Sequence, residues 1–357
     1  MTREERARMK EGLLLSDLLT HRGRPVTSQS DWKAKTEDIR ARILSVLGTA
    51  PAGTPDLDPE VLEEVREDGY VRRLVRYTSE PDERVPAYVL IPEGQKAPAP
   101  AALCLHQTIA EGKRETVGLL QDTHKAYALH LVRRGYVCIA PDHLAAGERI
   151  PPGLDAYDTS AFYPRHPHWS AVGKAIWDAR RAVDYLTTLP EVDPTRIGVI
   201  GNSLGGHGAF FAAAFDERLN ACVSNCGVST FSGSPNPLAW ARDRWYVYFP
   251  ALRPVFLENR RPPFDMHEFA ALIAPRAFLT ISSLTDESMP VNPDALQEFA
   301  AQLSRLYQFI GARGKFAWFY HDRGHSYPPE ARALAYKWLD EMLGLRRGEA
   351  LEGYPPK

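Results

Sequence analysis

The stretch Ile197-Gly-Val-Ile-Gly-Asn-Ser-Leu-Gly-Gly206 places Ser203 between two glycines, in the pattern Gly-x-Ser-x-Gly. An apolar run at residues 196–200 precedes the serine and predicts a strand, and residues 204–215 predict a helix. A strand that turns sharply into a helix is the setting of a nucleophile elbow, in which a strained serine points its hydroxyl out of the sheet. The glycines keep side chains out of the crowded turn. We therefore predict that Ser203 is a nucleophile; a surface serine in a plain turn is the alternative.

Apolar runs and helical patterns alternate on both sides of this turn. We expect strands at residues 70–77, 85–91, 101–105, 136–140, 196–200, 219–224, 277–281 and 316–320. We expect helices at residues 119–134, 171–188, 204–215, 293–311 and 329–345. This rhythm predicts an α/β fold with a mainly parallel central sheet and helices on both faces.

The chain divides into three predicted parts. They are an N-terminal helical extension at 1–69, a catalytic domain at 70–345 and a C-terminal tail at 346–357. Two segments of the domain, at about 150–170 and 228–267, are rich in proline and aromatic residues and interrupt the rhythm. Long insertions in a compact domain are usually functional loops, so we interpret the second as lid-like.

A serine hydroxyl needs a base to remove its proton, and in folds with such an elbow the acid and then a histidine follow the serine along the chain. His325 lies in the loop after the last predicted strand, where the imidazole can reach the elbow. We predict His325 as the base, with His321 at the strand end as the alternative. Asp286 follows the strand at 277–281, and we predict it as the acid in preference to Glu287.

Two backbone N–H groups are expected to bind the oxyanion. One belongs to Leu204, at the N-terminus of the helix after Ser203. The second should come from the loop after the strand at 101–105, and we assign it to Gln107. His106, in the same loop, is expected to be a structural or substrate-contacting residue. His207 is expected to pack in the core.

These motifs together resemble the dienelactone-hydrolase-like and acetyl xylan esterase-like branch of the α/β-hydrolase superfamily. The resemblance covers roughly residues 70–345 and rests on Leu105-His-Gln-Thr108, Pro141-Asp-His-Leu-Ala-Ala-Gly-Glu-Arg149, Gly201-Asn-Ser-Leu-Gly-Gly-His207, Asp286 and Gly324-His325. It implies the α/β-hydrolase fold, and it implies that Glu148 or Arg149 contacts the substrate or braces its loop. Dienelactone hydrolases proper use a cysteine nucleophile, whereas Ser203 argues for ordinary ester chemistry.

We therefore expect a serine-dependent carboxylic ester hydrolase that acts through an acyl-enzyme on a small ester such as an acetylated sugar. The aromatic insertion offers Trp240, Trp245 and Tyr246 as candidate substrate contacts. A serine peptidase of the prolyl-peptidase type is one alternative, although the roughly 70 residues before the first strand are too few for a propeller. A non-catalytic binding protein on the same fold is the other.

The composition of the chain limits the classes of partner that we expect. The formal net charge is −2, with 43 basic and 45 acidic residues mixed along the chain, so we expect no nucleic-acid partner. No apolar segment is long enough for a membrane span, and residues 1–20 do not have the pattern of a signal peptide, so we expect a cytoplasmic protein. We expect no metal and no cofactor, and oligomeric state stays open. The cysteines, which we expect to be buried free thiols, are Cys104, Cys138, Cys222 and Cys226.

We predict that hydrolysis rises as the pH passes about 6 to 7, because the imidazole of His325 has to be neutral to accept a proton. Initial rates on one ester from about pH 5 to about pH 9 measure this. A rate that does not change over that range would contradict the assignment of a histidine base.

Overall fold

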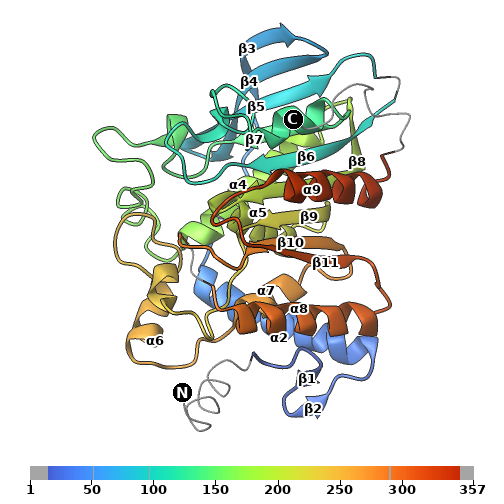
Figure 1. The fold of residues 1–357 in the computed structure, drawn as a ribbon. Helices are drawn as coiled ribbons and strands as arrows, with labels where there is room; N and C mark the ends of the chain where they lie inside the picture. Colours follow the sequence, from blue (N-terminus) through green and yellow to red (C-terminus); the bar gives the residue numbers. More distant parts are fainter. Residues whose placement is uncertain (1–14, 51, 96, 289–290, 346–357) are drawn as a thin grey trace.

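The structure is a computed structural model that describes residues 15–50, 52–95, 97–288 and 291–345. Within these ranges the main sheet has nine strands in the order β11-β10-β9-β8-β6-β7-β5-β4-β3 (Figure 1). The strands are β3 (Glu60–Glu67), β4 (Tyr70–Glu80), β5 (Glu83–Pro92), β6 (Ala99–Leu105), β7 (Val137–Pro141), β8 (Val192–Asn202), β9 (Leu219–Asn225), β10 (Ala277–Ser283) and β11 (Phe316–His321). Spatial neighbours from β7 to β11 pair in parallel, whereas β3, β4 and β5 form an antiparallel run that joins at β7. The predicted mainly parallel sheet is confirmed.

Helices cover both faces of the sheet (Figure 1). The longer elements are α2 (Gln29–Leu47), α3 (Tyr127–Val132), α4 (Ala171–Leu186), α5 (Leu204–Phe215), α7 (Met266–Ala271), α8 (Pro293–Phe309) and α9 (Pro329–Met342). The small ones are β1 (Thr20–His21), β2 (Arg24–Pro25), α6 (Arg253–Leu257), η1 (Gly112–Arg114), η2 (Gly147–Arg149), η3 (Pro237–Trp240) and η4 (Pro250–Leu252). Successive strand residues point to opposite faces. Ala101 and Leu103 of β6 therefore join the core beneath α2, α4, α5, α7 and α8, and Ala102 and Cys104 join the core beneath α3 and α9.

A buried network of charges ties the loop after β7 to the sheet. The Nζ atom of Lys174, in α4, lies 2.8 Å from a carboxylate oxygen of Asp178. It also lies 2.5 Å from Glu80 and 2.8 Å from Glu83, on either side of the β4–β5 turn. Arg149, at the end of η2, lies 2.6 Å from Glu83 and 2.9 Å from Asp178. Two cations thus balance three carboxylates in a region that excludes solvent.

The structure departs from the prediction at residues 60–67, which the sequence predicts to be helical. These residues form β3, the edge strand that pairs antiparallel with β4. Four of its eight residues are glutamates, which favour helices and carry no strand signal. The strand is instead held by its neighbour, where Arg73 lies directly opposite Glu64 with an Nε–O distance of 2.7 Å. Pairing with the next strand along the chain, across the two residues 68–69, therefore outweighs the helical propensity.

A second difference concerns residues 119–134, which are predicted as one helix. Only α3 (Tyr127–Val132) is helical. Asp122 accepts a hydrogen bond from the backbone N–H of His124 at 2.9 Å, and Ala126 donates to the carbonyl of Thr123 at 3.0 Å. These local hydrogen bonds compete with the helical ones and delay the start of the helix.

The three-part division of the chain stays a prediction. The tail at 346–357 and the charged segment at 3–11 lie outside the described residues. None of the helices in the part of the chain that the structure describes is long and apolar enough to cross a membrane. The cytoplasmic location stays a prediction as well.

Replacing Lys174 by methionine should lower the free energy of unfolding by about 3 to 5 kcal/mol, because Glu80 would be left with the His166 imidazole at 3.3 Å, and Glu83 and Asp178 would share Arg149. Urea titration of the variant and the wild type at neutral pH measures the difference. The matched control is Lys337→Met, which removes an exposed i,i+4 pair with Glu341 and should cost less than about 0.5 kcal/mol. A loss below about 1 kcal/mol for Lys174→Met would show that the network is not what holds this region.

Candidate active site

Ser203 occupies the sharp turn between β8 and α5. Its backbone has φ 55° and ψ −119°, a conformation that residues with a Cβ rarely adopt. The turn holds because there is no side chain on either flank. A Cβ on Gly201 would lie 2.1 Å from the carbonyl oxygen of Gly205, and one on Gly205 would lie 1.8 Å from that of Leu105. The Ser203 N–H donates to the carbonyl of Asn225 at 2.9 Å, which fixes the turn to β9.

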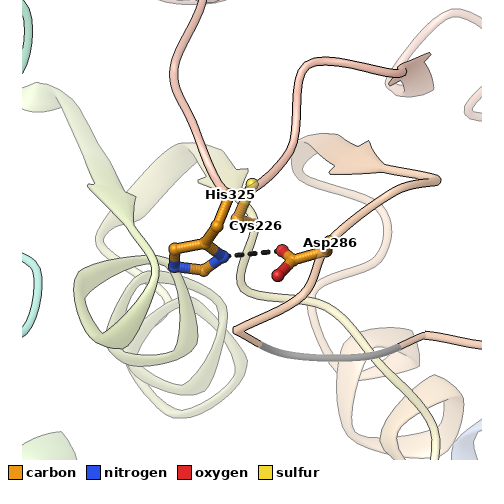
Figure 2. Close-up of side chains that lie close together, drawn as sticks. All are labelled: Cys226, Asp286 and His325. Carbon is orange, nitrogen blue, oxygen red and sulfur yellow. Dashed lines mark hydrogen bonds and ion pairs between the residues drawn. The ribbon is translucent and has the colours of Figure 1, made fainter.

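The three residues predicted for the triad lie in one hydrogen-bonded chain. His325 Nε2 is 2.8 Å from Ser203 Oγ, and His325 Nδ1 is 2.6 Å from Asp286 Oδ2. Figure 2 shows the second contact, with the imidazole and the carboxylate facing each other. Asp286 follows β10 and His325 follows β11, and these parallel neighbours end at the same edge of the sheet as β8. The serine hydroxyl can thus donate to Nε2 while the Nδ1–H donates to the carboxylate.

The two alternative residues, His321 for the base and Glu287 for the acid, are not part of this hydrogen-bonded chain. His321 ends β11, and its Nδ1 accepts the backbone N–H of Arg323 at 3.2 Å. Glu287 is exposed, whereas the Asp286 side chain is only 3% exposed and also accepts the N–H of Ser288 at 3.0 Å. The structure therefore brings together the residues that sequence reasoning preferred.

The loop after β6 lies against the first turn of α5. The contact of Gly205 with the Leu105 carbonyl leaves the N–H of Leu204 and the loop at 106–108 on the same side of the elbow. The Gln107 side chain is held at both ends, since its Nε2 donates to Glu115 at 2.7 Å and its Oε1 accepts from Asn202 at 2.7 Å. These two bonds hold the loop that carries the Gln107 N–H, and the role of that N–H as an oxyanion donor stays a prediction.

A chain of amide side chains, not anticipated from the sequence, connects all three loops. Asn202 donates to Gln107, and the Nδ2 of Asn225 donates to Asn202 Oδ1 at 2.5 Å. The same Nδ2 lies 3.0 Å from the carbonyl of Ser326, the residue after His325. The loop after β6 that carries Gln107, the elbow at Ser203 and the loop after β11 that carries His325 are thus joined by hydrogen bonds. The available signal was an asparagine on each of two neighbouring strand ends, but their register cannot be read from the sequence.

His106 is fully buried, and its role is structural. His106 Nε2 accepts the backbone N–H of His143 at 3.0 Å, and its Nδ1 donates to the carbonyl of Gln107 at 2.7 Å. Burial lowers the pKa of His106 to about 4, so the ring is neutral near pH 7. Both ring nitrogens are occupied within the protein, which favours the structural one of the two roles expected for this residue.

The loop residues Glu148 and Arg149 behave differently from each other. Arg149 has a side chain that is 4% exposed, and it ends in the buried charge network described above, so it braces the loop and has no surface for a substrate. Glu148 is about half exposed and lies 2.5 Å from Lys113 Nζ. Substrate contact by Glu148 stays a prediction.

The aromatic insertion folds over α5. Trp240 is buried, and its ring centroid lies 4.7 Å from that of His207. Tyr246 is buried as well and packs on Tyr157 and Tyr248. These two rings are core residues of the insertion, and the substrate contacts predicted for them stay a prediction. Trp245, by contrast, is 40% exposed.

The two insertions also hold each other. The indole N–H of Trp245 donates to the carbonyl of Ala156 at 3.1 Å, and the Tyr163 hydroxyl donates to Val247 at 2.6 Å. Tyr157, from the first insertion, donates its hydroxyl to the Gln107 carbonyl at 3.0 Å. The second insertion is therefore linked, through the first one, to the loop after β6 that carries Gln107.

Cys226 lies beside the acid and the histidine (Figure 2). Its Sγ, an Asp286 oxygen and a His325 ring nitrogen lie within 4.8 Å of one another, a set of atoms that could hold a metal ion. The thiol contacts the carbonyl of Ser326 at 3.5 Å, and burial raises its pKa to about 12. The protonated thiol therefore fills space behind the histidine loop as a small apolar group.

A family model described as the Abhydrolase family matches residues 15–287, which include the elbow and Asp286. The Bacillus subtilis (strain 168) protein YtaP, provisionally named a hydrolase, is 26% identical over 308 residues, which cover 85% of this chain and 98% of YtaP. The solved structure of a glucuronoyl esterase from Solibacter usitatus superimposes with a TM-score of 0.74 at 21% identity, covering 92% of this chain and 97% of that one. This structural likeness shows the shared fold.

Two curated carbohydrate esterases match shorter segments. The 4-O-methyl-glucuronoyl methylesterase 1 of Sodiomyces alcalophilus is 34% identical over 127 residues, 30% of this chain and 25% of that enzyme. The acetyl esterase Axe7A of Xylanibacter ruminicola (strain ATCC 19189 / DSM 19721 / CIP 105475 / JCM 8958 / 23) is 31% identical over 132 residues, 36% of this chain and 27% of that enzyme. The matched segments thus span about a quarter of each esterase.

Replacing Asn202 by leucine should lower kcat/KM by about 10- to 100-fold, because the loops lose the amide bonds that align them to within an ångström. Steady-state hydrolysis of one ester measures this, with the thermal midpoint as a check on folding. Asn220→Leu is the control, since Asn220 is an amide at the opposite end of β9 whose Nδ2 donates to Thr195 and Arg218. Full activity of a folded Asn202→Leu variant would show that the amide chain does not align the site.

Proposed function

Since the chain belongs to the Abhydrolase family, we propose that it hydrolyses carboxylic esters with Ser203 as the nucleophile. The observation that carries the proposal is the hydrogen-bonded chain from Ser203 Oγ through His325 to Asp286, located at a strained turn at the head of a helix. A serine, a histidine and a carboxylate in this order form the unit that activates a hydroxyl for acyl transfer.

In the proposed mechanism, Ser203 Oγ attacks the ester carbonyl carbon while its proton passes to His325 Nε2. Asp286 accepts the Nδ1–H throughout, so it orients the ring and stabilises the imidazolium that forms. The N–H groups of Leu204 and Gln107 are the proposed donors to the oxyanion, and the positive end of α5 adds to their field.

Collapse of the tetrahedral intermediate breaks the bond to the leaving alcohol, which takes the proton from His325. Water then enters, gives a proton to His325 and attacks the acyl-enzyme carbonyl. The second collapse returns the proton to Ser203 and releases the acid. Every proton transferred in this cycle passes through one imidazole.

We propose an ester of a sugar as the substrate class. Among the proteins that share matched segments or the fold, one is named a 4-O-methyl-glucuronoyl methylesterase, one an acetyl esterase and one a glucuronoyl esterase. The exposed indole of Trp245, near the oxyanion loop through Tyr157, is of the kind on which a sugar ring stacks.

The test is labelling with a fluorophosphonate, which reacts with an activated serine. The wild type should be labelled and Ser203→Ala should not, and Ser203→Ala should lose at least about 10³-fold in kcat. Ser45→Ala, at an exposed serine of α2, is the matched control and should be labelled fully. Absence of labelling of the wild type, or equal labelling of Ser203→Ala, would exclude the hydrolase.

Labelled enzyme is then assayed on acetylated sugars, methyl esters of uronic acids, longer acyl esters and aminoacyl-proline amides. Sugar esters are expected to have the highest kcat/KM. A preference for the amides would favour a peptidase instead, and labelling without turnover of any sugar ester would overturn the substrate class.

A further inference from the structure

Arg242, in the second insertion, is held between two aromatic rings. Its guanidinium carbon lies 5.0 Å from the ring centroid of Trp245 and 5.5 Å from that of Tyr248. Its Nε donates to the carbonyl of Ala239 at 3.0 Å. In contacts of this kind the rings pack on the faces of the guanidinium, and the carbonyl occupies its Nε edge. The N–H groups at the other edge, which lie in the guanidinium plane, stay available for a further partner.

No carboxylate within the described ranges lies within ion-pair distance of Arg242. The adjacent Asp243 is paired with Arg253 at 2.6 Å, and Arg149 is paired with Glu83 and Asp178. Arg242 is only partly exposed, so its charge is neither neutralised by a neighbour nor fully solvated. A guanidinium in this condition favours an anion that matches its planar edge.

The two rings beside Arg242 connect it to two parts of the candidate active site, the helix after Ser203 and the loop that carries Gln107. Tyr248 packs on His207 with centroids 5.8 Å apart, and the His207 N–H donates to the Ser203 carbonyl at 2.8 Å. On the other side, Trp245 packs on Tyr157, whose hydroxyl donates to the Gln107 carbonyl.

The electrostatics of His207 agree with this position. Burial, together with smaller contributions from the charges of His325 and Arg242, lowers the pKa of His207 to about 3. Arg242 therefore lies close enough to the nucleophile helix for its charge to be felt there.

We propose that Arg242 binds a carboxylate of the substrate that is separate from the ester being cleaved. The substrate is then an acidic saccharide ester, in which the esterified group and a free uronate carboxylate lie on the same or adjacent sugar residues. A carboxylate is the anion whose two oxygens match the guanidinium edge, and Trp245 beside it offers a face for the sugar ring. This inference rests on the proposed function for its chemistry, and it adds a specificity residue to it.

The test compares two substrates that differ only in charge, O-acetyl glucuronate and O-acetyl glucose, on the wild type and three variants. Arg242→Met should lower kcat/KM for the acidic ester by about 10- to 100-fold, mainly through KM, and leave the neutral ester unchanged. Arg242→Lys keeps the charge without the planar edge and should lie between. Arg244→Met, at an exposed arginine two residues on, should change neither rate. Equal loss on both esters, or no preference of the wild type for the acidic one, would overturn the proposal.

Binding separates this inference from the proposed function. Calorimetry of Ser203→Ala with glucuronate and with glucose needs no turnover. Glucuronate should bind more tightly than glucose by about tenfold or more, and Ser203→Ala combined with Arg242→Met should remove the difference. If the wild type is not labelled by fluorophosphonate but glucuronate binds through Arg242, the hydrolase fails and the anion site stands. If the enzyme is labelled but glucuronate binds no better than glucose, the anion site fails.

Discussion

The site depends on a close backbone contact between α5 and β6. At this contact no atom larger than hydrogen fits between Gly205 and the carbonyl of Leu105. This contact forces the helix to begin directly beneath the loop that follows β6. The N-terminus of the helix and that loop therefore lie next to each other, with Ser203 beside them. The rest of the site is arranged around that junction, because both walls of it are backbone and cannot shift independently.

Parallel strands then supply the other two side chains. The strands β8, β9, β10 and β11 lie side by side, so their carboxyl ends open at one edge. Residues separated by 122 and 39 positions in the sequence are within hydrogen-bond distance of the same imidazole. The amides of Asn202, Gln107 and Asn225 cross the strand ends and keep these loops in register. Amides suit this position because they do not titrate, so their hydrogen bonds do not depend on pH.

The sequence was informative where a function depends on its immediate neighbours along the chain. The elbow is local, since glycines, strand and helix all surround Ser203 within a few residues, and Asp286 and His325 follow because each lies just past a recognisable strand. It was uninformative where a role depends on a contact that no local pattern shows. β3 looks helical until β4 pairs with it, the bond from Asn225 to Asn202 needs the β8–β9 register, and the role of Arg242 depends on the rings that pack around it. The sequence left two roles open for His106 and for Arg149 and did not show that Trp240 is buried, since a polar or aromatic residue in a loop does not reveal whether the loop is covered.

The proposed base follows one of the two edge strands of the main sheet. In the described part of the chain β11 has a strand neighbour on one side only (Figure 1). His325 lies in the loop between β11 and α9. An edge strand is the part of a sheet that opens first in local fluctuations, while the centre stays closed. A transient opening of this edge would remove the imidazole from Ser203 without unfolding the sheet, and the serine would become inert at that moment. Thermal inactivation would then precede the loss of secondary structure, and the rate of inactivation would report the stability of one strand.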